Sequence, residues 1–153
     1  MLQAGSQAPN FTLKNQDDND VSLADYSGGW LLLWWFPAAN AAGDALQGSG
    51  LQAALGEFEK KGCAVAGISF DSVAESAAYR ERAGFSFPLL SDPEQLVSGL
   101  YQTIRNPSEE HYQFPLRISY LIDPQGRILR AYEVHDPGGH AATVLADLEA
   151  AHR

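Results

Sequence analysis

The longest uninterrupted apolar run of the chain, WLLLWWF, spans residues 30–36. It does not alternate between apolar and polar positions, which predicts a strand covered on both faces, as in the centre of a parallel sheet. Pro37 ends the run, and after a stretch of small residues Leu51, Leu55 and Phe58 recur at helical spacing. The chain therefore passes from the carboxyl end of a buried strand into a helix amino terminus, where ligands gather in open α/β sheets. We expect the functional site at this junction.

The chain before this strand is predicted to form a hairpin. Two short extended pieces, 10–13 and 21–23, flank a polar stretch that contains Asp17, Asp18 and Asp20. This stretch lacks the glycine and the distal glutamate of a calcium loop, so a solvated turn is the better interpretation.

The chain after the first helix predicts a second buried strand over residues 63–69. Ser72 and Glu75 then form a capping box that opens another helix, and Gly84 follows its end. A short apolar segment occupies residues 87–90.

A third helix is expected to begin at Asp92, which would cap it. Pro93 would take its first position, Gln95 would complete the capping box, and Leu96 and Leu100 would form its buried stripe.

The last third of the chain is predicted to hold a surface loop, a hairpin and a closing helix. The loop covers residues 101–115, the hairpin pairs 116–122 with 128–134, and the helix covers 140–152 and buries Val144, Leu145 and Leu148. The resulting order of elements predicts an α/β domain of the thioredoxin fold with an amino-terminal addition.

Composition narrows the classes of function. The 153 residues, 45% hydrophobic and 19% charged, suit a single domain spanning 1–153. The net charge of −9 argues against nucleic acid and anionic membrane as partners. The one cysteine, Cys63, excludes an intramolecular disulfide, and neither a leader pattern nor a membrane-spanning run is visible. We therefore expect a cytoplasmic protein.

Six short motifs follow one another over nearly the whole chain. They are APNFTL (8–13), VSL (21–23), FP (36–37), GISFDS (67–72), FPLLSDP (87–93) and RISYLIDPQG (117–126). Through these linked motifs the sequence is similar to the peroxiredoxins of the alkyl hydroperoxide reductase/thiol-specific antioxidant family, and to their bacterioferritin-comigratory (Q-type) branch in particular. This resemblance implies a thioredoxin-like fold of peroxiredoxin type, with a central mixed sheet flanked by helices and an amino-terminal hairpin.

The resemblance also implies a catalytic pattern that this chain lacks. The family carries Pro-x-x-x-Thr-x-x-Cys, whose thiolate attacks the peroxide beside an arginine and a helix amino terminus. Alignment on Pro37 places Ala41 at the threonine and Asp44 at the peroxidatic cysteine. The resolving cysteine of the Q-type branch falls on Ser49.

Three positions of the family site remain in the chain: Pro37, Gln47 and Arg117. Because the helix terminus and Arg117 favour an anion, we expect Asp44 to be ionised and paired with Arg117, with charged atoms roughly 4 Å apart or less. Gln47, one turn further on, either bonds to one of these two groups or is an ordinary polar residue that lines the pocket. The pair is either a structural helix cap in a pocket without activity, or it holds the domain permanently in a state that resembles the thiolate or oxidised-sulfur form of the family.

The sequence therefore predicts a protein that has lost thiol-dependent peroxide reduction and acts as a non-catalytic binding or regulatory domain. It would bind a protein partner or a small anion at the Asp44/Arg117 pocket, use no cofactor or metal, and exist as a monomer or homodimer. The alternative is an antioxidant thiol oxidoreductase with residual activity through Cys63 and an external thiol. The position of Cys63 in an apolar run of the sequence favours a buried, unreactive cysteine. A third candidate function is hydrolysis or acid–base chemistry by Asp44 with Arg117 and Gln47, but these residues do not include a nucleophile and a base to activate it.

Other candidate residues have simpler interpretations. His135, Asp136 and His140 lack metal-ligand spacing and predict a surface cluster. Asp71 is expected to organise a loop. The tryptophans are expected in the core, although one indole could face a partner; they are Trp30, Trp34 and Trp35.

Overall fold

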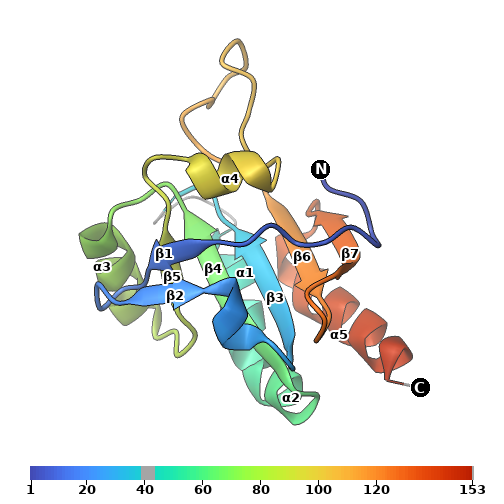
Figure 1. The fold of residues 1–153 in the computed structure, drawn as a ribbon. Helices are drawn as coiled ribbons and strands as arrows, with labels where there is room; N and C mark the ends of the chain where they lie inside the picture. Colours follow the sequence, from blue (N-terminus) through green and yellow to red (C-terminus); the bar gives the residue numbers. More distant parts are fainter. Residues whose placement is uncertain (39–43, 153) are drawn as a thin grey trace.

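The computed structural model describes residues 1–38 and 44–152, and the side chains of residues 44 and 45 lie outside the description. Within the described chain, seven strands form one mixed sheet in the order β2-β1-β5-β4-β3-β6-β7 (Figure 1). No described helix is long and apolar enough to cross a lipid bilayer.

The strands are β1 (Thr12–Lys14), β2 (Asp20–Ser22), β3 (Trp30–Trp35), β4 (Cys63–Ser69), β5 (Leu89–Ser91), β6 (Ile118–Ile122) and β7 (Ile128–Glu133). The α-helices are α1 (Asp44–Ala53), α2 (Leu55–Lys60), α3 (Val73–Ala83), α4 (Leu96–Leu100) and α5 (His140–Ala151). Two short 3-10 helices, η1 (Leu23–Tyr26) and η2 (Pro137–Gly139), complete the described elements.

Strand β3 lies at the centre of the sheet, as the apolar run predicts. It runs parallel to β4, with Trp35 opposite Ile68, and antiparallel to β6, with Trp34 opposite Ser119. Leu31 to Trp35 are buried because both faces of the sheet are covered.

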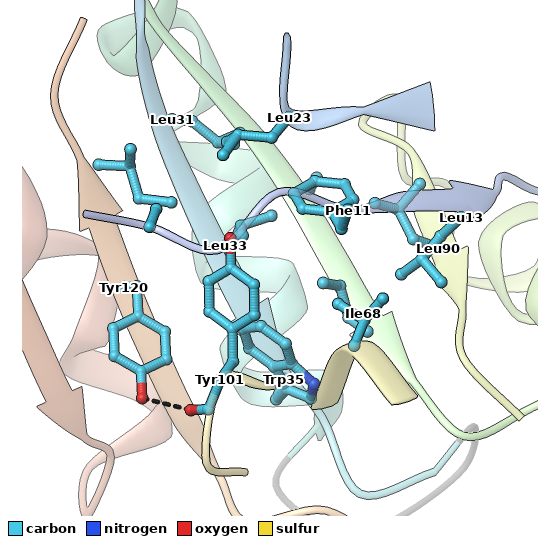
Figure 2. Packing of buried hydrophobic residues seen from close by; sticks show 14 of the residues in the cluster. Phe11, Leu13, Leu23, Leu31, Leu33, Trp35, Ile68, Leu90, Tyr101 and Tyr120 are labelled. Atoms are coloured by element: carbon cyan, nitrogen blue, oxygen red, sulfur yellow. Dashed lines mark hydrogen bonds between the residues drawn. The ribbon is translucent and has the colours of Figure 1, made fainter. Parts of the chain in front are cut away.

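Two apolar clusters cover the two faces of the sheet. Figure 2 shows the first, in which Trp35 packs with Tyr101 and Tyr120 beneath the amino-terminal segment and α4. Tyr120 donates a hydrogen bond to the Tyr101 carbonyl at 2.6 Å. The second cluster includes Trp34 and is covered by α1, α2, α3 and α5. Because side chains alternate along a strand, adjacent tryptophans of β3 lie in different clusters.

Most of the predicted elements are confirmed. The hairpin forms, with Leu13 opposite Val21. Ser72 and Glu75 make the capping box of α3, and Gly84 ends that helix at φ +73°. The helix expected after β3 is divided at Ala54 into α1 and α2.

The prediction for the third helix is wrong at its start. Helix α4 begins at Leu96, preceded by Gln95 at φ +63°, and not at Pro93. Asp92 nevertheless satisfies a helix donor, because its buried carboxylate accepts the Ser98 N–H at 2.7 Å and the Ser98 hydroxyl at 2.6 Å. The Ser98 hydroxyl oxygen in turn accepts the indole N–H of Trp35.

The predicted buried face of this helix is also wrong. Val97 and Tyr101 face the core, whereas Leu96 and Leu100 are 69% and 56% exposed. The prediction of a surface loop over residues 101–115 is wrong at Tyr101, because its side chain is fully buried and its hydroxyl donates a hydrogen bond to the Pro9 carbonyl. The aromatic contacts with Trp35 and Tyr120, distant in sequence, set this orientation.

Candidate functional site: the Arg117–Gln47 junction

The chain leaves β3 at its carboxyl end and, after the residues that are not described, enters α1. Arg117 directly precedes β6, the antiparallel neighbour of β3, so its side chain reaches this junction. Its Nη1 donates a hydrogen bond of 2.9 Å to Oε1 of Gln47 on α1. The structure thus brings together two of the residues that the sequence places at the site.

The Gln47 side chain is fully buried, yet only one end of its amide is satisfied. Its Oε1 accepts from Arg117, whereas its Nε2 has no hydrogen-bond partner among the described residues. Buried polar groups in native proteins are nearly always paired, so an unpaired amide N–H beside a guanidinium indicates a position for an acceptor.

The remaining site residues are placed only in part. The backbone of Asp44 forms the first position of α1, whereas its side chain, and all of Ala41, lie outside the described residues. The predicted ion pair between Asp44 and Arg117 therefore stays a prediction. Pro37 is half-buried near the end of β3, and Ser49 is exposed on α1.

A second polar pair, which is buried, involves a residue two positions after Arg117. Ser119 and Arg117 are two residues apart and therefore share a face of the strand. The Ser119 hydroxyl lies 3.0 Å from Nε2 of His140, the first residue of α5, and both side chains are buried. Burial lowers the pKa of His140 to about 4, so its ring is neutral at neutral pH.

The expected surface cluster around His140 is therefore only partly right. His135 is exposed beside Glu133, at 3.8 Å, and Asp136 caps η2 by accepting the Gly139 N–H, whereas His140 points into the core. No group of three or more potential metal ligands occurs in the described part of the chain.

The one thiol of the chain lies far from this junction. Cys63 begins β4 and is paired with Trp30, whereas the junction follows Trp35, which is paired with Ile68. Five strand residues separate the two ends by roughly 16 Å. Cys63 is 2% exposed, and burial raises the pKa of its thiol to about 12. Its expected burial is confirmed.

The other candidates behave as structural residues. Asp71 organises the loop after β4, where its Oδ2 accepts the Ser69 hydroxyl at 3.0 Å. Trp34 and Trp35 are fully buried, whereas Trp30 is half-buried with its ring 5.6 Å from that of His152.

Comparison with known sequences decides the family. The profile of the AhpC/TSA family matches residues 4–131. This chain belongs to the AhpC/TSA family. A putative peroxiredoxin of Mycobacterium tuberculosis is 36% identical over 150 residues, which cover 96% of this chain and 95% of that protein. Peroxiredoxin Bcp of Escherichia coli K12 is 33% identical over 146 residues, with 94% of each chain covered.

Solved structures of AhpC/TSA proteins share the fold. A mutant of PrxQ from Xylella fastidiosa is 29% identical with a TM-score of 0.91, covering 100% of this chain and 99% of that one. The peroxidoxin BcpB of Mycobacterium tuberculosis is 25% identical with a TM-score of 0.90, and 98% of each chain is covered. The chain is thus a peroxiredoxin of the Bcp/PrxQ branch with a thioredoxin-like fold, as the motifs predict.

No sequence pattern predicts the Ser119–His140 pair. Serine and histidine 21 positions apart carry no local signal, and only the packing of α5 against the sheet brings them together. The alternation of β6 was the one available clue, because it predicts that Ser119 shares the face of Arg117.

Proposed function

We propose that this AhpC/TSA protein lacks thiol peroxidase activity and serves as a binding or regulatory domain. The position of Cys63 carries the proposal. A peroxidatic thiol must be exposed and ionised beside the cation and helix terminus of the junction. Cys63 is buried at the other end of β4 with a pKa raised to about 12. These properties also argue against the alternative of residual redox activity through Cys63.

The ligand proposed for the junction is a small oxyanion. Arg117 supplies positive charge, the amide N–H of Gln47 faces no acceptor among the described side chains, and α1 begins nearby. Guanidinium groups and helix amino termini both favour oxygen anions. An oxyanion bound there would be held by these polar groups, and its binding would not require a reactive thiol.

A peroxide-consumption assay tests the catalytic part. With hydrogen peroxide or an alkyl hydroperoxide and a thiol reductant, we expect the wild type and Cys63→Ser to show the same background rate. Turnover that depends on Cys63 would contradict the proposal and establish the enzymatic alternative.

A gain-of-function pair serves as the positive control for that assay. Asp44→Cys restores a thiol at the helix terminus and should give a weak peroxidase. Adding Ala41→Thr supplies the hydroxyl that orients the peroxide and should raise the rate about tenfold or more. If the single variant equals the double variant, this interpretation of the pocket is wrong.

Thermal unfolding with inorganic sulfate tests the ligand part. A ligand that binds only the folded state raises the melting temperature with its concentration. We expect such a rise for the wild type and its loss in Gln47→Met, with Gln52→Met as the control on the same helix. Equal rises in all three proteins would place the anion elsewhere.

A further inference from the structure

A groove lies between the β1–β2 hairpin and the segment that leads from β5 into α4. It is lined by Thr12 to Lys14 on one side and by residues between Ser91 and Val97 on the other, and its volume is about 320 Å³. Strands β1 and β5 pair only at Lys14 and Ser91, so the rest of β1 is not paired with β5. The groove thus lies where two neighbouring parts of the sheet separate.

One wall of the groove continues into exposed apolar side chains of α4, the helix drawn in yellow in Figure 1. Leu96 lines the groove and is 69% exposed. Leu100 lies one helical turn further on. Ile104 packs back on α4, where its Cδ1 would lie 3.4 Å from a Cβ added to Gly99. Half of the large hydrophobic side chains that are exposed in the described chain belong to this surface. Such grouped exposure marks interaction sites rather than ordinary surface.

The rim of the groove is negatively charged. Lys14 is the one basic residue among the described lining residues, and it is already paired with Asp20 at 2.8 Å. Asp20, through its hydrogen bond and its charge, and to a smaller extent the charge of Asp18 raise the pKa of the Lys14 ammonium group. Glu94 adds a further carboxylate on the opposite wall. The exposed rim charges therefore sum to −2, from three carboxylates and one ammonium.

We propose that this groove and the α4 surface bind a segment of a partner protein that carries apolar anchor residues flanked by lysine or arginine. The leucines and isoleucine of α4 would cover the anchors, and the carboxylates of the rim would face the basic flanks. Neither Arg117 nor Gln47 lines this groove, so the inference does not depend on the function proposed for their junction.

The charge of the rim argues against a second copy of this chain as the occupant. In a two-fold dimer through this surface, each patch faces its own copy. The carboxylates at positions 18, 20 and 94 would then be concentrated at one interface between two chains of net charge −9. Like charges placed together in this way oppose association.

Fluorescence anisotropy with a labelled synthetic peptide tests the proposal. The probe carries two leucines flanked by lysine and arginine, and a second probe carries glutamate in place of the basic residues. We expect saturable binding of the basic probe, weakened by salt, and little binding of the acidic one.

Three variants assign the binding to the groove. Leu96→Ser should weaken binding about tenfold or more, because it removes an exposed apolar contact without disturbing the core. Glu94→Lys should weaken binding and reduce its salt dependence. Leu46→Ser is the matched control, since Leu46 is 63% exposed on α1 and does not line the groove; its affinity should equal that of the wild type.

Several results would overturn the proposal. They are the absence of saturable binding up to about 1 mM peptide, equal binding of the two probes, and an equal loss in Leu46→Ser and Leu96→Ser. Sedimentation equilibrium provides the remaining one: a wild-type dimer that Leu96→Ser dissociates would assign the surface to a second copy of the chain.

Discussion

The two ends of the central strand β3 differ in the surroundings that they provide for polar and ionisable side chains. At the carboxyl end of β3, Arg117, Gln47, Ser119 and His140 form buried or half-buried polar pairs between the sheet and two helices. At the amino end, the thiol of Cys63 lies in an apolar cluster with its pKa raised to about 12. The difference shows that reactivity follows the local environment. The end that can stabilise charge carries no cysteine, and the end with the cysteine cannot stabilise its thiolate.

The largest expected effect is the protection of Cys63. A disulfide reagent at mildly alkaline pH should label native Cys63 at least about a hundredfold more slowly than the denatured chain. Burial keeps the reagent from the thiol and raises its pKa to about 12, which lowers the thiolate fraction at that pH. In a Cys63→Ser background, Ser49→Cys on the exposed face of α1 should label quickly. Fast stoichiometric labelling of native Cys63 would contradict the comparison.

The second effect concerns His140 at the polar end. Its pKa is lowered from 6.5 to about 4 in the folded protein, so the unfolded chain binds a proton first as the pH falls. The stability from neutral His140 is complete above pH 6.5 and is lost as the pH falls towards 4, by about 3 kcal/mol.

Urea denaturation across this pH range measures the effect. His140→Gln should lose about 3 kcal/mol less stability on acidification than the wild type does, whereas exposed His135→Gln should follow the wild type. Parallel acid limbs for the wild type and His140→Gln would show that His140 is not buried in its neutral form.

A smaller effect is expected for the bond between Arg117 and Gln47. A double-mutant cycle with Gln47→Met and Arg117→Met should give a coupling free energy of about 1–3 kcal/mol, as for hydrogen bonds to charged groups. Gln52→Met, which breaks more exposed bonds to Ser86, should cost less than Gln47→Met. A coupling free energy of zero within error would mean that the hydrogen bond between Arg117 and Gln47 does not contribute to the stability of this end of the strand.

The smallest effect is expected for Asp44→Asn, which keeps the shape of the side chain and removes its charge. Because Arg117 is half-buried, the pair with Asp44 should contribute about 1 kcal/mol or less near neutral pH. If Asp44→Asn and the wild type had the same free energy of unfolding at both neutral and acidic pH, the hypothesis that this carboxylate takes the place of the thiolate would be wrong.

Local sequence patterns alone determined the elements whose signals are contained within a few residues. The unbroken apolar run predicted β3, the capping box predicted α3, and the motifs predicted the AhpC/TSA family. Burial of Cys63 followed from its apolar neighbours. The absence of cysteine at positions 44 and 49 is likewise a property of the sequence.

Only the tertiary structure decided which side chains meet across elements. The start and the exposed face of α4 depend on Asp92, Ser98 and Trp35, which lie after β5, in α4 and in β3 and are joined by hydrogen bonds in the core. Tyr101 is buried because it packs against aromatic rings of β3 and β6. His140 is buried where its ring can form a hydrogen bond with Ser119. Local propensity cannot encode such contacts, since the free energy that fixes them comes from burial and pairing between distant segments.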